Sequence, residues 1–329
     1  MAVEKPVTSP PPTPPARMAG ELPRCDSILC RYSEVGLKGR NRGAFERALT
    51  ESIEHALSEL GELSVKRERG RIYVTPVGRT AFEPWEIERV RHLSGRLFGI
   101  VSLSPAVLVR PELPDIERAV YSVFPTLYER ATARAASSSE PVRYAIRVRK
   151  NNPGFPLRSQ ALEIRFADFL LDRYGRLQVD LRNPQVRMEV EIRRERGFVS
   201  WEKIPGPGGL PSGTGGKILA LLSGGIDSPV ACHELMRRGC EVDFLTFHSA
   251  PYTPPETLHK VARLATVLRS YQRGRGVLYA VNLADAQKQI RDLCAERFRT
   301  ILYRRLMIRC AERLSACAHA TAICTGDSL

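Results

Sequence analysis

One segment in the last third of the chain restricts the fold more than any other. It starts with an apolar run, residues 218–222, that is long enough for one buried parallel strand. The run ends at Ser223-Gly224-Gly225. Asp227 and Ser228 follow as candidate N-cap residues, and Pro229 stands where a first helical turn tolerates proline. Glycines let a ligand approach the backbone, and free amides at a helix start favour an anion. The order strand, tight loop and helix therefore predicts a phosphate-binding loop.

The spacing within this loop excludes two common phosphate-binding motifs. No lysine follows the glycines, as the Walker loop requires, and the glycines do not fit G-x-G-x-x-G. Ser223-Gly224-Gly225-Ile226-Asp227-Ser228 instead resembles the pyrophosphate loop of the ATP-pyrophosphatase superfamily. Its members cleave ATP between the α- and β-phosphates and form an adenylate. A Gly-rich turn without a ligand is the alternative, and it is less favoured because five positions match in the right context.

Charge points to a class of partner. The 329 residues, enough for two or three domains, carry a formal net charge of +14. The basic excess occurs on both sides of Leu210, which favours a polyanion, nucleic acid first. An Arg-rich composition without such a partner explains the charge equally well. No apolar run approaches the ~18 residues of a membrane span, so we expect no membrane partner.

Cysteine usage predicts a reducing compartment. The eight cysteines include no C-x-x-C pair and lack the spacing of a disulfide framework. We therefore expect reduced, mostly buried thiols in a cytoplasmic protein, and no metal-ligating set. Cys310 and Cys317 share one helix face, so an iron–sulfur site there is an alternative, although ordinary packing is favoured.

The part of the chain before the loop reads as two α/β units behind a tail. Residues 1–23 are Pro-rich, and we expect them to be disordered. Apolar periodicity then predicts the order β-α-β-β-α-β, a ferredoxin-like unit. Its expected elements are strand 28–32, helix 45–60, a hairpin around Arg69-Gly70, helix 84–93 and strand 96–103. The second unit is expected to contain helices 114–135 and 157–174 and strands 107–110, 142–150, 177–181, 186–192 and 198–201.

Two basic features of these units are candidate RNA contacts. The loop at residues 34–42 combines two glycines with three cations, which suits a phosphate backbone. In the strand at 142–150, Arg143, Arg147 and Arg149 alternate with apolar residues, so one face is basic. A solvated loop and an ordinary exposed strand face are equally good explanations.

A Gly/Pro-rich linker at residues 205–216 precedes the loop, and a β-α-β-α pattern follows it. Such alternation predicts a parallel, doubly wound sheet, in which ligands lie beyond the carboxyl ends of the strands. Three strand ends should then meet at one edge: residues 223–228, 246–249 and 325–327.

Together these stretches resemble the tRNA uridine 4-sulfurtransferase (4-thiouridine synthetase) family, from about Cys25 to the last residue. The matching segments are residues 28–42, 97–106, 177–190, 222–231, 247–249, 304–309 and 325–329. The resemblance implies a ferredoxin-like domain (24–84), a THUMP RNA-binding domain (85–204), the linker (205–216) and an adenine-nucleotide α-hydrolase-like ATP-pyrophosphatase domain (217–329).

The resemblance also implies an activity. ATP, with Mg²⁺, adenylates O4 of the uridine at position eight of tRNA, and persulfide sulfur from a cysteine desulfurase displaces AMP. Some members supply sulfur for thiamine thiazole synthesis, and some are homodimers. The nucleotide contacts that the resemblance implies are Leu221, Leu222, Thr246, Phe247, Arg304 and Gly326. The chemistry of the step adds the loop residues Ser223, Gly224, Gly225, Asp227 and Ser228, whose amides would hold the departing pyrophosphate. Asp227 is the candidate catalytic residue, because its carboxylate is suited to orient the loop or a Mg²⁺.

The end of the chain departs from the family pattern. The family continues beyond the position of Leu329 with sequence that completes the nucleotide site and with a sulfur-carrying cysteine, so we expect a C-terminally truncated chain. Two alternatives follow from the residues. One is an RNA-binding protein with an inert ATP domain, and the other is a different ATP-pyrophosphatase, which tRNA dependence would distinguish.

Overall fold

The computed structural model describes residues 22–68, 70–134 and 140–326. The predicted disordered tail therefore lies almost wholly outside the described residues, as does Asp327. The chain forms two compact units. One contains the described residues up to Leu29 with Tyr73–Arg89 and Ser104–Lys203, and the other contains Cys30–Ile72, Val90–Leu103 and Ile204 onward. No helix in the described part of the chain is both long and apolar enough to cross a membrane.

The predicted ferredoxin-like order is confirmed. The elements are β1 (Ser27–Arg31), α1 (Arg42–Ala56), β2 (Leu63–Glu68), β3 (Arg71–Pro76), α2 (Pro84–Ser94) and β4 (Ser102–Val109), with short 3-10 turns at Glu34–Leu37, Gly39–Asn41 and Ser58–Leu60. The strand expected at 96–103 is wrong. Leu97, Phe98 and Ile100 are buried in a turn, and Gly99 takes a φ of +95°. The apolar residues at 97–100 are therefore buried without being in a strand. The strand β4 begins at Ser102 and extends to Val109, so it includes most of the separate strand expected at 107–110.

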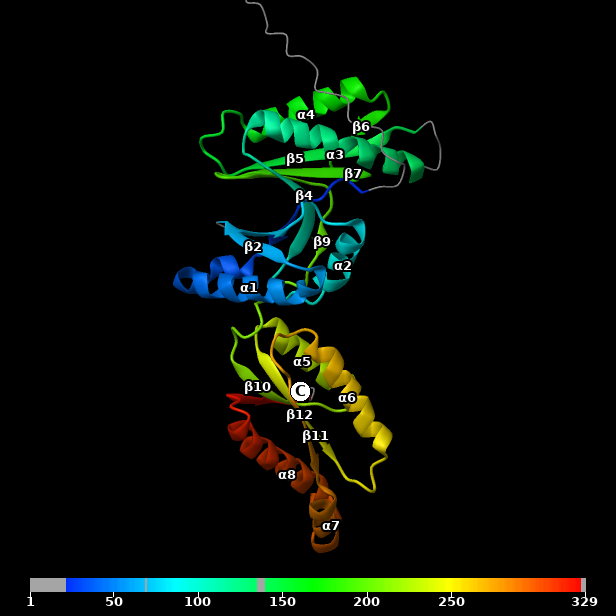
Figure 1. Cartoon of the computed structure of the whole chain (residues 1–329). Helices are drawn as coiled ribbons and strands as arrows, with labels where there is room; N and C mark the ends of the chain where they lie inside the picture. Colours follow the sequence, from blue (N-terminus) through cyan, green and yellow to red (C-terminus); the bar gives the residue numbers. More distant parts are fainter. Residues whose placement is uncertain (1–21, 69, 135–139, 327–329) are drawn as a thin grey trace, which may run out of the picture. The chain divides into compact units, whose positions relative to one another are not determined.

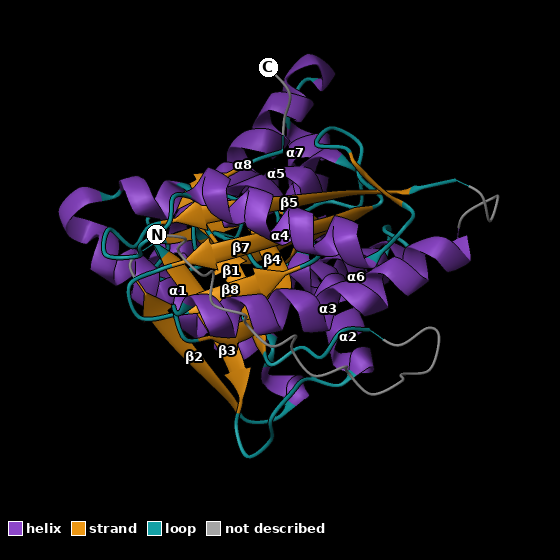
Figure 2. Cartoon of the chain, turned by 90° about the horizontal axis from the view of Figure 1, so that it is seen from above, coloured by secondary structure: helices purple, strands orange, loops and turns teal. Residues whose placement is uncertain are grey.

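The next elements form the second predicted α/β unit. They are α3 (Leu113–Arg134), β5 (Val142–Lys150), α4 (Ser159–Arg173), β6 (Leu177–Val179), β7 (Val186–Ile192) and β8 (Gly197–Ser200). The alternating apolar residues of β5 and β7 pack with Phe124, Leu162 and Phe166 from the two helices into one core. Figure 2 shows α3 and α4 lying across these strands. The nine-stranded sheet has the order β2-β3-β1-β4-β8-β7-β5-β6, and β9 (Ile204–Pro205) pairs with β4.

The C-terminal domain is doubly wound, as predicted. Its elements are β10 (Lys217–Leu221), α5 (Asp227–Arg237), β11 (Glu241–His248), α6 (Pro255–Arg269), β12 (Leu278–Asn282), α7 (Ala284–Leu293), α8 (Glu296–Cys317) and β13 (Ala322–Cys324). The four strands are parallel in the order β12-β11-β10-β13.

Helices cover both faces of this sheet. Cys232 and Met236 of α5 and Val261 and Ala265 of α6 pack on one face, and Ala311 of α8 packs on the other. Figure 1 shows the sheet between these helices. From β10 the chain moves to β11 and β12 and then returns to β13 on the other side. The strand order therefore reverses between β10 and β13, which is where open α/β sheets bind ligands.

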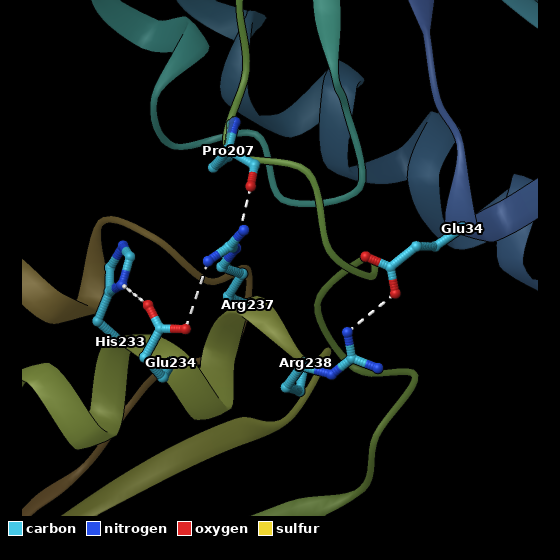
Figure 3. A network of polar contacts seen from close by, with 6 residues as sticks. All are labelled: Glu34, Pro207, His233, Glu234, Arg237 and Arg238. Atoms are coloured by element: carbon cyan, nitrogen blue, oxygen red, sulfur yellow. Dashed lines mark hydrogen bonds and ion pairs between the residues drawn. The ribbon is translucent and has the colours of Figure 1, made fainter.

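The segment predicted as a linker is ordered and packed. Leu210 and Ser212 are buried, and the amide of Leu210 donates to the carbonyl of Arg237 (2.9 Å). Nε of Arg237 donates to the carbonyl oxygen of Pro207 (3.0 Å), and Arg238 forms an ion pair with Glu34 (2.9 Å), as Figure 3 shows. The segment thus holds the C-terminal end of α5 in a fixed position.

Candidate ATP-binding site

The loop after β10 is closed by two serine side chains. The amide of Ser223 donates to Oγ of Ser228 (2.9 Å), and the two hydroxyl oxygens are 3.0 Å apart. Ser228 is buried, so its hydroxyl is committed to this contact. The prediction that Asp227 or Ser228 is the N-cap is wrong. Helix α5 begins at Asp227, its N-cap is Ile226, and no side chain caps it. Ser228 faces back to the loop entrance and fixes the loop instead.

Backbone amides are available around this loop. Within the residues that the structure describes, the amides of Gly224, Ile226 and Asp227 have no hydrogen-bond acceptor, whereas that of Gly225 reaches Oγ of Ser223 at 3.3 Å. These donors stand at the start of an 11-residue helix, whose dipole favours negative charge. The arrangement can therefore accept phosphate oxygens.

The Asp227 carboxylate is exposed and makes no ion pair or hydrogen bond within the described structure. No group of three potential metal ligands occurs among the described residues. Magnesium usually binds through one or two carboxylates together with substrate phosphates. One free carboxylate at the edge of the loop is compatible with that mode, and the catalytic role of Asp227 stays a prediction.

Gly326 brings the end of β13 against the start of α5. A β-carbon built on Gly326 would lie 2.5 Å from Cα and 2.7 Å from the amide nitrogen of Ser228. No side chain fits in that space. Two of the three predicted strand ends therefore meet at the reversal point of the sheet, with glycine required at their contact.

The third strand end, residues 246–249 of β11 and the segment after it, lies beside the carboxyl end of β10. Leu221 of β10 lies opposite Leu245 of β11, so Thr246 and Phe247 continue β11 just beyond the end of β10. Leu222 is buried on the face that carries α5 and α6, whereas Leu221 and Phe247 pack on the face that carries α8. Thr246 is also buried. These four predicted contacts thus stand at the carboxyl edge of the sheet, with side chains largely in the core.

Among the described residues, no hydrogen bond or ion pair joins Arg304 to the loop. Arg304 is exposed on α8 and forms no ion pair within the described residues. It precedes Ala311 by seven residues and so shares the helix face that packs on the sheet. Because α8 leads into a strand parallel to β10, it runs back along the sheet, and Arg304 lies toward the carboxyl edge. Its nucleotide contact stays a prediction.

Sequence reasoning missed one cation. Lys260 of α6 lies close to Gly224 of the loop, and no local sequence pattern predicts this proximity. Lys260 is not part of a recognisable sequence motif. Its position near the loop becomes visible only once α6 is packed beside α5.

Two thiols of the C-terminal domain lie in surroundings that favour their protonated form. Burial raises the pKa of Cys232, one turn into α5, to about 12, and burial also raises the pKa of Cys324 at the end of β13. Both remain protonated at neutral pH. All eight cysteines are free, but only four of them are buried, so the prediction of mostly buried thiols holds for half of them.

Comparisons with known proteins agree with this architecture. Three family models match in the order ThiI ferredoxin-like domain (residues 27–104), THUMP domain (112–202) and thiamine biosynthesis protein ThiI (213–329). A probable tRNA sulfurtransferase from Thermoanaerobacter sp. (strain X514) is 38% identical over 304 residues, which cover 92% of this chain and 74% of the relative. Another, from Lachnoclostridium phytofermentans, is 34% identical with the same coverage.

The chain belongs to the ThiI family of tRNA sulfurtransferases.

Solved structures support the ThiI-family fold. A 4-thiouridine synthetase in complex with RNA and bound ATP is similar to this chain with a TM-score of 0.75 and 30% identity, covering 92% of this chain and 73% of that one. PH1313 from Pyrococcus horikoshii is similar with a TM-score of 0.65 and 28% identity, covering 81% of this chain and 82% of that one. The family and fold class predicted from the sequence are confirmed.

The two basic features of this ThiI-family chain differ in how free their cations are. In the loop before α1, Arg42 is paired with Glu46 (2.7 Å), whereas Arg40 is exposed and has no ion pair among the described residues. On β5, Arg143 and Arg147 each lie 4.0 Å from a carboxylate. Arg149 of β5 is, like Arg40, exposed and without an ion pair among the described residues, so these two are the cations of the two features best placed for a phosphate.

Proposed function

We propose that this chain uses ATP to activate a uridine of tRNA and replaces the C4 oxygen with sulfur, giving 4-thiouridine. The observation that carries the proposal is the loop from Ser223 to Ser228 at the reversal point of the parallel sheet, with available amides and with Gly326 packed against it. The ThiI-family matches and the likeness to an ATP-bound 4-thiouridine synthetase support the same chemistry.

The chemistry explains why a pyrophosphate loop is needed. The C4 oxygen of uracil is a poor leaving group, and its ester with AMP is a good one. In the activating step the oxygen bonds to the α-phosphorus of ATP, the bond from that phosphorus to the bridging oxygen breaks, and the N3 proton passes to solvent. The amides of Gly224, Ile226 and Asp227 would hold the departing pyrophosphate.

Mg²⁺ would neutralise phosphate charge in this step, held by ATP oxygens and by Asp227. Because Asp227 is exposed and unpaired in the described structure, it can turn toward such an ion without breaking another contact. Arg304 would approach the nucleotide from the side of α8, and Leu221, Leu222, Thr246 and Phe247 would form the wall beside it.

Finer points of the proposal follow the family pattern. The modified nucleotide is the uridine at position eight, and a cysteine desulfurase supplies the persulfide in the cytoplasm. A role in supplying sulfur for thiazole synthesis and a homodimeric state are part of the same proposal.

The test is tRNA-dependent conversion of ATP to AMP and pyrophosphate. We expect AMP only when tRNA is present, and loss of at least a hundredfold in rate with Asp227→Ala. Asp285→Ala is the matched control, since Asp285 is also an exposed aspartate in the first turn of a helix in this domain. It should leave the rate unchanged.

Each other outcome identifies a different function. AMP formation without tRNA would indicate a different ATP-pyrophosphatase. Binding of tRNA without any AMP would indicate an RNA-binding protein whose ATP domain is inert. A tRNA in which the uridine at position eight is replaced by cytidine should abolish AMP formation, and retention would contradict the assigned position.

A further inference from the structure

We propose that Lys260 binds the β- and γ-phosphates of ATP and stabilises the pyrophosphate as it leaves. This inference rests on the proposed function and adds a binding residue on α6, outside the loop. It concerns only the C-terminal domain, whose helices α5 and α6 pack side by side on one face of the sheet.

The first observation is the position of Lys260 against the loop. A β-carbon built on Gly224 would lie 3.6 Å from Cδ and 4.0 Å from both Cε and Nζ of Lys260. The Lys260 side chain therefore passes close to Gly224, whose amide has no acceptor among the described residues. A lysine ammonium near an anion-binding loop adds a full charge to the partial charges of the amides.

The second observation is that Lys260 is uncommitted. It forms no ion pair or hydrogen bond within the described residues, although Glu256 stands one turn before it on α6. A helix pair with this spacing usually stabilises a solvent-exposed helix. Because Lys260 does not form this ion pair with Glu256, its ammonium can bind an anion held by the loop.

The third observation concerns its neighbours. Lys260 lines a groove of about 510 Å³ together with Glu256, His259, Arg263 and Leu264, and no residue of the loop from Ser223 to Ser228 is among the lining residues. The three atoms nearest to a β-carbon built on Gly224 all belong to Lys260, so of these residues Lys260 is the one placed beside the loop. Loop amides on one side and an ammonium on the other would hold the pyrophosphate between them.

The reaction explains what this charge would do. When the bond between the α-phosphorus and the bridging oxygen breaks, that oxygen keeps the electron pair, and pyrophosphate gains negative charge. A cation beside the β- and γ-phosphates stabilises this charge more in the transition state than in bound ATP. Lys260 should therefore affect both the binding of phosphates and the rate of adenylation, but not the binding of AMP.

The test compares equilibrium binding of ATP, magnesium pyrophosphate and AMP in the absence of tRNA, using wild type, Lys260→Met and Lys260→Arg. We expect Lys260→Met to weaken ATP and pyrophosphate binding about tenfold, the effect of losing one charge-assisted hydrogen bond, and to leave AMP binding within about twofold. Lys260→Arg should restore most of the lost affinity, because it keeps the charge.

Arg263→Met is the matched control, since Arg263 lines the same groove one turn later on α6. It should leave all three affinities unchanged. Equal affinities in wild type and Lys260→Met would overturn the proposal. So would equal loss of all three ligands, which would show a structural role. Failure of the wild type to form AMP with tRNA would contradict the proposed function alone, because the comparison of binding affinities needs no turnover.

Discussion

At the scale of single residues, the contact between Gly326 and Ser228 leads to the first prediction. Gly326→Ala would place a methyl group 2.5 Å from Cα of Ser228, so the end of β13 or the start of α5 must shift. We expect ATP affinity to fall at least tenfold and the melting temperature to drop by several degrees. Isothermal titration and thermal unfolding measure the two effects. Gly95→Ala is the control, since its β-carbon would meet nothing within 4 Å, and it should leave both unchanged.

Thiol reactivity is the second prediction at this scale. Burial raises the pKa of Cys25, Cys30 and Cys232 to about 12, so these thiols are protonated at pH 8 and also inaccessible. Cys317 is exposed. Iodoacetamide at pH 8 should modify Cys317 and spare the other three, and all should react in denaturant. The labelled peptides are identified by mass spectrometry. Modification of Cys232 as early as that of Cys317 would show that Cys232 is not buried.

At the scale of elements, the pairing of β10 and β11 contains a partly buried ion pair. Nζ of Lys217 is 2.8 Å from Oδ2 of Asp243, and this contact raises the pKa of Lys217. Asp243 is buried and also accepts the amide of Val277 (2.9 Å). Lys217→Met would leave that carboxylate without its cation, and we expect the free energy of unfolding to fall by about 1–2 kcal/mol, discounted because Lys217 is one-third exposed.

The pH dependence of this pair has a defined sign. Because the folded pKa of Lys217 lies above its unfolded value, its stabilisation is present below about pH 10 and is lost as pH rises through the folded pKa. Urea unfolding at pH 7 and above pH 10 should therefore show the difference between wild type and Lys217→Met shrinking with pH. Lys288→Met, an exposed lysine without an ion pair in the described structure, should show no difference at either pH.

The elements also show what the sequence could and could not predict. Apolar periodicity placed nearly every helix and strand, and the spacing from Ser223 to Ser228 identified the loop, because both signals are local. The turn at 97–101 was mistaken for a strand, since a buried apolar run has the same pattern in either structure. The positions of Ser228 and Lys260 relative to the loop depend on how α5 and α6 pack, and no local signal encodes that.

At the scale of the whole molecule, the net charge of +14 leads to a prediction about salt. Binding of tRNA releases counterions from phosphates, so affinity should fall as ionic strength rises. With about four phosphates contacted, raising salt from 50 to 200 mM should weaken binding on the order of a hundredfold.

Arg40→Ala should reduce the slope of log K against log salt by roughly one, because Arg40 is exposed and unpaired in the described structure. Lys288→Ala, which removes an exposed lysine from the ATP-binding domain, should leave the slope unchanged. If Arg40→Ala leaves the slope unchanged, the loop at residues 34–42 does not contact the phosphates. If the affinity of the wild type for tRNA does not change with salt, the positive net charge reflects amino-acid composition and not a nucleic-acid partner.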